Sequence, residues 1–183
     1  MKIIPWVDPI TNDPLEETET HLINNDRKYP IINGIPKFVQ ENSDEPQYDI
    51  EKCFAYQWTE SDFGQPDKFS DEAIKKDVIE TMDLTEDDLS LFNDKLVLDV
   101  GVGSGASSRL WAPRAKEFHG VDIGNGIYRA KNTLTNSVKN PILSHADLHH
   151  LPEYDADRRL FRMYTDRIQR RVSYAKQDAQ NNC

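Results

Sequence analysis

Residues 96–122 read LVLDVGVGSGASSRLWAPRAKEFHGVD, and this stretch decides the fold. It opens with a nearly continuous apolar run, Leu96 to Val100, broken only by Asp99. Such a run is typical of a parallel strand that is buried on both faces of a sheet. A glycine-rich loop, a short helical segment and a second apolar strand, residues 117–121, follow before Asp122. This order predicts an α/β protein with a Rossmann-like, doubly wound parallel sheet.

The loop places Gly101, Gly103 and Gly105 at alternate positions. Glycine is required where a chain turns sharply or where a ligand must approach the backbone without an intervening Cβ. Asp122 follows Gly101 by 21 positions and ends the neighbouring strand. A carboxylate at that place can accept hydrogen bonds from both hydroxyls of a ribose. The loop and Asp122 together predict a site for a cofactor that contains a ribose.

Two classes of cofactor fit this spacing. Gly101-x-Gly103-x-x-Ala106 satisfies the dinucleotide fingerprint, so the pattern alone leaves a nicotinamide cofactor open. Asp99 favours S-adenosylmethionine, because its carboxylate would be unfavourable beside the pyrophosphate of NAD. S-adenosylmethionine has no phosphate, and its methionine end carries an ammonium and a sulfonium that a carboxylate attracts. A third alternative is a pocket that binds nothing.

Residues 50–154 resemble the class I S-adenosylmethionine-dependent methyltransferases of the small-molecule "type 11" kind. The first motif of that family matches residues 99–105, DVGVGSG, and its acidic ribose ligand falls on Asp122. Its third motif, a strand ending in an acidic residue before Leu-Pro, falls on residues 145–152, HADLHHLP. Residues 54–58, FAYQW, resemble the aromatic segment that often covers the cofactor in this family.

The resemblance assigns roles to individual residues. It implies that Asp147 holds the adenine amino group, that Leu148 contributes a backbone N–H, and that Ile123 packs on the adenine ring. The expected binding set for S-adenosyl-L-methionine is therefore Asp99, Gly101, Gly103, Gly105, Asp122, Ile123, Asp147 and Leu148. No catalytic residue is assigned, although His149 or His150 could act as a general base near the methyl acceptor.

The first 40 residues predict a small β module. Leu15–Ile23 and Lys28–Ile32 have strand character, and residues 24–26, NND, form a good hairpin turn between them. A second turn is expected at residues 33–34, Asn-Gly. Pro30 and Pro36 predict that the ribbon occupies edge positions, because proline cannot donate a ladder hydrogen bond.

Residues 29–39, YPIINGIPKFV, resemble the end of a zinc-ribbon-like module that accompanies some methyltransferases. In that module cysteine pairs that precede this segment hold zinc, but where a Cys-Pro pair would be expected this chain has Asp8-Pro9. No cysteine precedes Cys53, and structural zinc requires four thiolate or imidazole ligands. We therefore expect a metal-free β ribbon. We also expect His145, His149 and His150 to be exposed loop residues and not metal ligands.

An acidic helical lead-in, residues 41–94, carries a net charge of −13. Ser70 is expected to cap a helix whose apolar stripe contains Ile74, Val78 and Met82. Thr85 and Asp88 indicate an approximate capping box at a second helix. These features predict a solvated acidic surface.

The S-adenosylmethionine-binding half is expected over residues 95–154, and a basic tail over residues 155–183. Six of the ten arginines lie between Arg158 and Arg171. The spacing of the apolar residues predicts an amphipathic tail helix, with its stripe at Phe161, Tyr164, Ile168, Val172 and Ala175. Only three strands are expected before this tail, at residues 96–100, 117–122 and 141–147. The family has seven strands, so the sheet is expected to be incomplete, as in a truncated or frame-shifted methyltransferase.

Composition narrows the function classes further. The net charge of −10 argues against nucleic acid as the main partner, because phosphate binding requires clustered Lys and Arg. Two cysteines, no long apolar run and no signal peptide indicate a cytoplasmic protein without a membrane span. The expected function is methyl transfer to a small-molecule acceptor. The alternative is a non-catalytic interaction protein derived from a methyltransferase, and the oligomeric state is left open.

Overall fold

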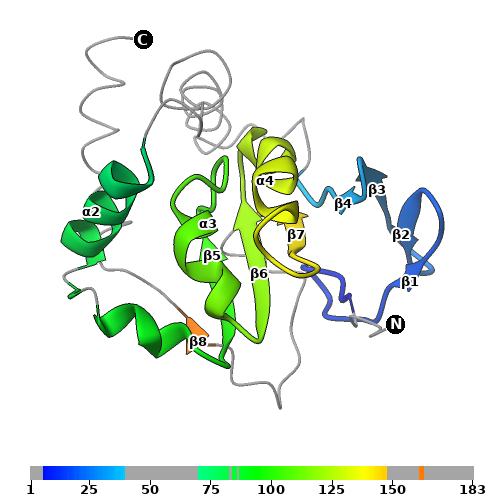
Figure 1. Ribbon diagram of the computed structural model, residues 1–183. Helices are drawn as coiled ribbons and strands as arrows, with labels where there is room; N and C mark the ends of the chain where they lie inside the picture. Colours follow the sequence, from blue (N-terminus) through cyan, green and yellow to red (C-terminus); the bar gives the residue numbers. More distant parts are fainter. Residues whose placement is uncertain (1–5, 40–69, 83, 86, 148–160, 163–183) are drawn as a thin grey trace, which may run out of the picture.

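The computed structural model describes residues 6–39, 70–82, 84–85, 87–147 and 161–162. Within these residues the strands form two four-stranded sheets. The N-terminal sheet has the order β1-β2-β3-β4 and is antiparallel, while the second has the order β7-β6-β5-β8 and is parallel. Figure 1 shows the antiparallel sheet beside β7, with α4 next to β7 and with α3 and α2 farther from the antiparallel sheet.

The three predicted parallel strands are confirmed as β5 (Leu96–Val100), β6 (Glu117–Asp122) and β7 (Ile142–His145). β5 and β6 pair in register over their shared length, from Leu96 opposite Glu117 to Val100 opposite Val121. β7 pairs with the other edge of β6. The α/β class and the Rossmann-like parallel sheet are therefore confirmed. This arrangement brings the residues that follow β5 and β6 to one edge of the sheet.

A fourth parallel strand, β8 (Phe161–Arg162), pairs with Val97 and Leu98 of β5. The prediction that the tail, residues 155–183, is an amphipathic helix with Phe161 in its stripe is wrong for these two residues. The second edge of β5 carries backbone N–H and C=O groups that need partners, and a paired strand supplies them. The remaining residues of the predicted tail helix lie outside the described residues.

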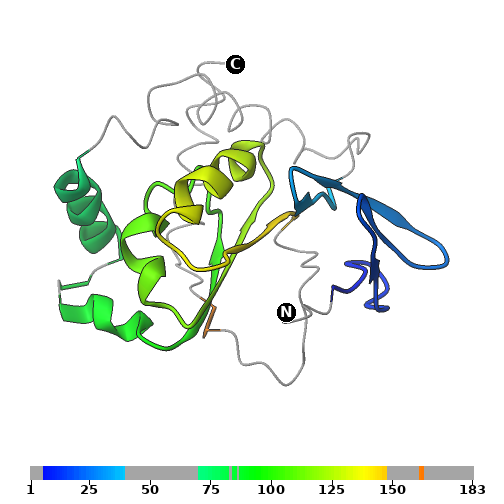
Figure 2. The same ribbon diagram turned by 45° about the vertical axis from the view of Figure 1, so that its right-hand side comes forward.

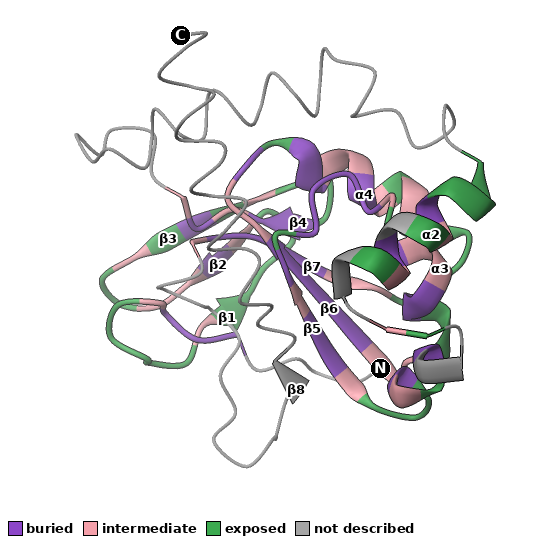
Figure 3. Cartoon of the chain, turned by 90° about the vertical axis from the view of Figure 1, so that its left-hand side faces the viewer, coloured by how far each residue is buried: buried purple, intermediate pink, exposed green. Residues whose placement is uncertain are grey.

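The helices pack on one face of the parallel sheet (Figure 3). They are α2 (Asp71–Met82), the 3-10 helix η3 (Asp87–Phe92), α3 (Ser108–Trp111), the 3-10 helix η4 (Ala112–Arg114) and α4 (Gly126–Thr135). The predicted cap of α2 is confirmed, because Ala73 N donates to Ser70 Oγ over 3.2 Å. Ile74 and Val78 are buried, as expected. The side chains of Met82 and Asp88 lie outside the description, so the rest of that stripe and the capping box stay predictions.

Alternation along the strands divides the apolar side chains between two cores. Val97 and Phe118 point to the helical face, where they join Phe92 and Trp111 in the larger core. The rings of Phe92 and Trp111 stack with their centroids 4.5 Å apart. Leu98, Val100 and Val121 belong to the opposite face, and their cluster also holds residues of the antiparallel sheet. A buried side chain of this size contributes about 1.5–3 kcal/mol to folding.

The antiparallel sheet contains β1 (Glu16–Glu17), β2 (His21–Ile23), β3 (Lys28–Ile32) and β4 (Ile35–Pro36). The predicted single strand over residues 15–23 is wrong, because it is divided into β1 and β2. The hydroxyl of Thr18 donates to His21 O over 2.8 Å and accepts from His21 N over 3.0 Å. Such local side-chain bonds favour a turn over a continuous strand.

Both predicted turns are confirmed. Asn24 Oδ1 accepts hydrogen bonds from Asp26 N and Arg27 N, at 3.0 and 2.8 Å, and closes the hairpin between β2 and β3. Asn33 and Gly34 have φ values of 51° and 71° and join β3 to β4. A two-residue turn with positive φ at both positions matches the twist of a hairpin.

The prediction of an edge position is wrong for Pro30. It lies in β3, which has β2 on one side and β4 on the other. The position tolerates proline because β4 ends at Pro36, and Lys37 N then donates to Pro30 O over 2.8 Å without requiring an N–H in return. Pro36 itself lies in β4, at the end of the strand order.

The two sheets meet at this point. Lys37 forms an isolated parallel bridge with His145 at the end of β7, and Phe38 N donates to His145 O over 2.8 Å. Trp6, Leu22, Tyr29 and Phe38 pack with Leu98, Val100, Val121 and Ala146 in the second core. Figures 2 and 3 show the antiparallel sheet on the face of the parallel sheet opposite the helices. The antiparallel sheet is thus a cover for the parallel one.

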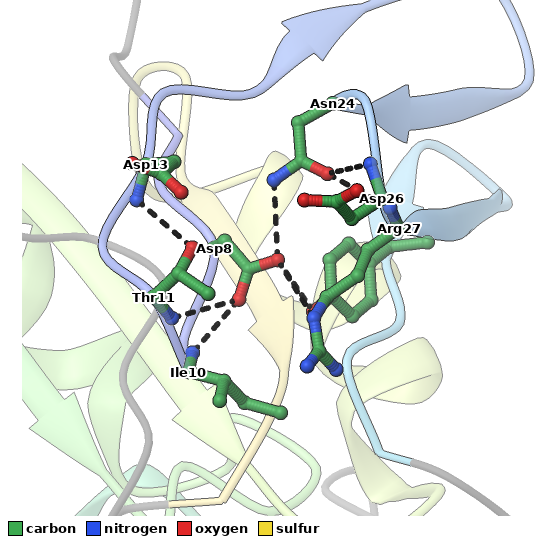
Figure 4. A network of polar contacts seen from close by, with 8 residues as sticks. Asp8, Ile10, Thr11, Asp13, Asn24, Asp26 and Arg27 are labelled. Atoms are coloured by element: carbon green, nitrogen blue, oxygen red, sulfur yellow. Dashed lines mark hydrogen bonds and ion pairs between the residues drawn. The ribbon is translucent and has the colours of Figure 1, made fainter.

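Asp8 organises the loop before β1 (Figure 4). Its fully buried carboxylate accepts hydrogen bonds from Ile10 N at 2.8 Å and Thr11 N at 3.1 Å. The other oxygen lies 3.1 Å from Tyr29 Oη, and Asn24 and Arg27 also reach it, at 3.3 and 3.4 Å. Asp8, at the place expected for Cys-Pro, therefore joins this loop to the β2–β3 hairpin.

The partners of Asp8 determine its ionisation. Burial by itself raises the pKa of Asp8, but the bonds from Ile10, Thr11, Tyr29 and Asn24 together bring the pKa below its ordinary value of 3.8. Burial and the adjacent negative charge of Asp8 raise the pKa of Tyr29 to about 12. The centre therefore holds an ionised carboxylate and a neutral phenol over the whole physiological range.

Among the helices of the described residues, none combines the length and the apolar character that crossing a membrane requires.

Candidate functional site

The loop after β5 has the geometry that its glycines require. Gly101, Gly103 and Gly105 have φ values of 82°, 55° and 76°. Gly101 N donates to Val121 O over 2.8 Å, which holds the start of the loop against β6. The loop therefore lies where the carboxyl ends of β5 and β6 meet, which is the usual place for ligands in open α/β sheets.

Two of these glycines have different surroundings. A Cβ on Gly105 would lie 3.0 Å from Leu134 Cγ and 3.3 Å from the Cα of Ala130, so this residue lets the loop pack against α4. A Cβ on Gly101 would meet no atom of the described residues within 4 Å, and Gly101 is exposed. Gly105 is thus required for packing, while Gly101 leaves bare backbone facing open space.

Asp122 braces the loop. One carboxylate oxygen accepts from Gly103 N and the other from Gly124 N, both over 2.7 Å. Burial raises the pKa of Asp122, and these two hydrogen bonds oppose that effect. A carboxylate offers about four acceptor sites, so further donors can still be bound. The spacing in the sequence predicted a ribose ligand at Asp122, but not the bracing bonds from Gly103 and Gly124.

Asp99 lies at the end of β5 on the side of α3. Ser108 Oγ, itself buried, donates to Asp99 Oδ2. Burial raises the pKa of Asp99 to about 6, the hydrogen bond from Ser108 opposes the rise, and the charge of Asp122 adds to it. Two carboxylates that repel each other at one loop favour a cationic ligand over an anionic one.

Ser104, in the same loop, is a buried polar residue. Its side chain is 1% exposed, and its Oγ has no hydrogen-bond partner within the part of the chain that the structure describes. Such an unpaired hydroxyl costs about 1–3 kcal/mol. The open backbone at Gly101, the two carboxylates and this hydroxyl are together compatible with a ligand that carries positive charge and hydrogen-bonding groups.

The other predicted binding residues are only partly placed. Ile123 follows β6 and is half-buried, and Asp147 follows β7 and is also half-buried. Both therefore lie at the same edge of the sheet as the glycine loop. Leu148 lies outside the described residues, as do Cys53, residues 54–58, His149 and His150. Their predicted roles stay predictions.

His145 differs from the expectation. It was predicted to be an exposed loop residue, but it is fully buried. Its Nε2 lies 2.8 Å from Ile123 O, and its Nδ1 lies 2.9 Å from the hydroxyl oxygen of Tyr128. The sequence pattern missed this residue because a polar side chain at a strand end is typical of an exposed loop. Within the described residues, no three side chains of His, Cys, Asp or Glu gather as a metal site would require.

Comparisons with known proteins give one kind of match. Neither a protein family nor a curated protein matches the sequence. Among solved structures, the chain is similar to the magnesium protoporphyrin IX methyltransferase of Synechocystis PCC 6803, a crystal structure with bound SAH. The TM-score is 0.39 and the sequence identity 18%, over 55% of this chain and 53% of that chain. The chain thus spans about half the length of that structure.

Proposed function

We propose that this protein is an S-adenosylmethionine-dependent methyltransferase, or the cofactor-binding part of one, which acts on a small-molecule acceptor. The observation that carries the proposal is Asp99, a carboxylate with a pKa raised to about 6 beside an open glycine loop. The raised pKa means that the ionised form of Asp99 is unfavourable in the free protein, and a bound cation would stabilise that form. S-adenosylmethionine brings two cationic groups and no phosphate.

The residues around the loop suit the parts of this cofactor. Asp99 would face the methionine end, and the exposed backbone at Gly101 would let that end approach closely. Asp122 has acceptor capacity left for ribose hydroxyls while it braces Gly103. Ile123 and Asp147 would lie at the adenine. When bound, the cofactor supplies an electrophilic methyl group on a sulfonium.

The contribution of the protein to methyl transfer would be mainly proximity and alignment. Holding two reactants in line can contribute about 7–11 kcal/mol towards a barrier. The loop of residues 101–105 would fix one reactant at the sheet edge. An acceptor that loses a proton would also require a base, and no described residue is assigned that role.

The electrostatics of the site disfavour the nicotinamide alternative. A pyrophosphate at the glycine loop would lie near Asp99 and Asp122, both of which have raised pKa values in the absence of any added negative charge. Two further negative charges would increase that repulsion. The fingerprint of Gly101, Gly103 and Ala106 is therefore not matched by a site suited to phosphate.

Calorimetric titration of S-adenosylhomocysteine into the wild-type protein and the Asp99→Asn variant tests the proposal. Asparagine keeps an acceptor for Ser108 but removes the charge, so we expect about 10- to 150-fold weaker binding. Because the ammonium group of S-adenosylhomocysteine favours the ionised form of Asp99, wild-type affinity should increase from pH 5 to pH 7, and the variant should lose this dependence. Asp26→Asn removes an exposed charge in the β2–β3 turn and should leave the affinity unchanged.

Titration with NADH completes the test. A folded wild-type protein that binds NADH more tightly than S-adenosylhomocysteine would overturn the proposal in favour of a nucleotide-dependent enzyme. A folded protein that binds neither would overturn it in favour of a non-catalytic interaction protein.

A further inference from the structure

His145 is a buried polar residue that the proposed chemistry does not use. It ends β7, and its ring lies between Ile123 O, 2.8 Å from Nε2, and the hydroxyl of Tyr128, 2.9 Å from Nδ1. The rings of His145 and Tyr128 also meet edge to face, with their centroids 5.4 Å apart and their planes at 85°. The imidazole thus connects the end of β7 with the turn after β6 and with α4.

The two hydrogen bonds define the state of the ring. A carbonyl oxygen can only accept, so Nε2 must carry a proton and donate to Ile123 O. In a neutral imidazole Nδ1 is then an acceptor, and the hydroxyl of Tyr128 donates to it. The carbonyl of Ile123 therefore sets the tautomer, and the hydrogen bond from Tyr128 to Nδ1 fixes the orientation of the ring in which His145 holds Ile123.

Ile123 lies within the turn that aims Asp122. Asp122 precedes it, and Gly124, which follows it, donates its N–H to Asp122 Oδ1 over 2.7 Å. Asp122 O also accepts from Ala146 N, at 3.0 Å, next to His145 in the chain. Fixing Ile123 O therefore fixes the turn in which the carboxylate of Asp122 receives one of its two bracing bonds.

The backbone of His145 faces the antiparallel sheet. Its carbonyl oxygen accepts from Phe38 N over 2.8 Å, and the residue forms a parallel bridge with Lys37. A single buried residue therefore contacts the covering sheet through its main chain and the candidate site through its side chain.

We propose that His145 is a positioning residue, set by Tyr128, which holds the turn of residues 123–124 so that Asp122 keeps the glycine loop in its binding geometry. This inference rests on the proposed function for its consequence in cofactor binding. The geometric part stands without it, because the bracing of Gly103 and Gly124 by Asp122 exists in the protein alone.

Hydrogen–deuterium exchange of the full chain, read at the amides of Gly103 and Gly124, tests the geometric part without any ligand. Tyr128→Phe removes only the hydroxyl, and we expect both amides to exchange roughly 2- to 10-fold faster than in the wild type. Tyr29→Phe is the matched control, because it removes a hydroxyl from the buried Asp8 network instead. Equal exchange at the two glycines in both variants would overturn the proposal.

Substitutions of His145 itself sharpen the test. His145→Gln keeps an N–H donor at the end of the side chain, so the amide of Gly124 should stay protected from exchange. His145→Leu has no such donor, so the same amide should exchange faster. Equal protection in the Gln and Leu variants would overturn the role of the Nε2 donor. If His145→Leu does not fold, His145→Gln is compared with Tyr128→Phe instead. The amide of Gly124 must then be better protected in His145→Gln.

The consequence for binding is read in the same variants by titration with S-adenosylhomocysteine at a temperature where all are folded. Tyr128→Phe should weaken binding by roughly 2- to 10-fold, while Tyr29→Phe should leave it unchanged. Loss of stability without loss of affinity in Tyr128→Phe would overturn positioning and leave a structural role. Absence of binding by the wild type would instead contradict the proposed function, and the exchange data would still decide the role of His145.

Discussion

Asp8, fully buried in the loop before β1, and Asp99, half-buried at the end of β5, are both acidic residues, but their pKa values move in opposite directions. Asp8 is surrounded by two backbone N–H groups, a phenol, an amide and a guanidinium, and its pKa is lowered. Asp99 has the hydroxyl of Ser108 and the neighbouring charge of Asp122, and its pKa is raised to about 6. Within the described residues, Asp8 thus has five donor groups around it, whereas Asp99 has the single hydroxyl of Ser108.

The difference separates a structural centre from a candidate ligand site. A buried carboxylate with enough donors stabilises the fold in its ionised form, whereas one with few donors destabilises the free protein. Proteins accept the second situation mostly at functional sites. The following experiments test whether this contrast holds.

Asp8→Ala should have the largest effect. It removes the shared acceptor of Tyr29, Asn24 and Arg27 and of the loop amides, and breaking a buried charge network costs about 3–5 kcal/mol. Urea unfolding should show this loss, with the first structural change in the antiparallel sheet. Asp13→Ala, an exposed residue of the same loop, is the control. Equal losses in both variants would contradict a structural centre at Asp8.

The next largest losses of stability are expected from alanine substitutions at Gly105 and Gly101. Gly105→Ala forces positive φ on a residue whose Cβ would lie 3.0 Å from Leu134 Cγ, and we expect a loss of about 2–4 kcal/mol. Gly101→Ala has the same backbone strain without the contact, and should lose about 1–2 kcal/mol. Binding should reverse the order, because the added Cβ of Gly101→Ala would stand in the open space over the loop. Thermal unfolding and titration in parallel provide the two readings.

Asp99→Asn should raise stability by about 1–2 kcal/mol at pH 7. The folded protein holds the proton of Asp99 more tightly than an unfolded chain, in which the ordinary pKa is 3.8. Ionisation therefore costs stability as the pH rises from about 4 to above 6, and below pH 4 both states are protonated. The gain should thus vanish at about pH 4, as urea unfolding at the two pH values would show.

Asp8 should behave in the opposite way. Its folded pKa is lowered, so its contribution is present above pH 3.8 and is lost as the pH falls through the folded value. A gain for Asp99→Asn that persisted at about pH 4 would therefore indicate a cause other than the charge.

The smallest effect is expected at a third carboxylate, Asp71. It forms an ion pair of 2.6 Å with Arg109 Nη2, but its side chain is 70% exposed. Surface pairs contribute about 0–1 kcal/mol, so Asp71→Asn should change the free energy of unfolding by about 0.5 kcal/mol or less. Addition of salt should reduce even this difference. A larger loss would show that exposure alone does not rank the acidic residues of this protein.

Several parts of the fold that follow from local pattern were predicted correctly, although the break between β1 and β2 was not. The apolar runs of β5 and β6 and the turn at Asn33-Gly34 carry their own signals, because a buried parallel strand and a positive φ each demand particular residues. The pairing of β8 with β5 and the position of Pro30 in an inner strand were not predictable, since both depend on which distant segment lies alongside. Local patterns carry no information on that.

In the candidate site, too, some features were predictable from the sequence and others depended on distant segments. The spacing of Gly101 and Asp122 predicted that they meet at one sheet edge, and they do. The hydrogen bonds of His145 with Ile123 and Tyr128 were not predictable, because a histidine at a strand end has the same sequence signature whether it is exposed or buried. Burial of a polar residue becomes visible only once its partners are in place.

The bridge between Lys37 and His145 also bears on the order of folding. The hairpins of the antiparallel sheet close over short loops and can form early, but their docking partner, β7, is far along the chain. Contacts of such long range slow folding, because the loop between them must be ordered first. Until β5, β6 and the end of β7 have come together, Trp6, Tyr29 and Phe38 lack their partners in the second core, so the N-terminal hairpins expose apolar side chains that favour aggregation.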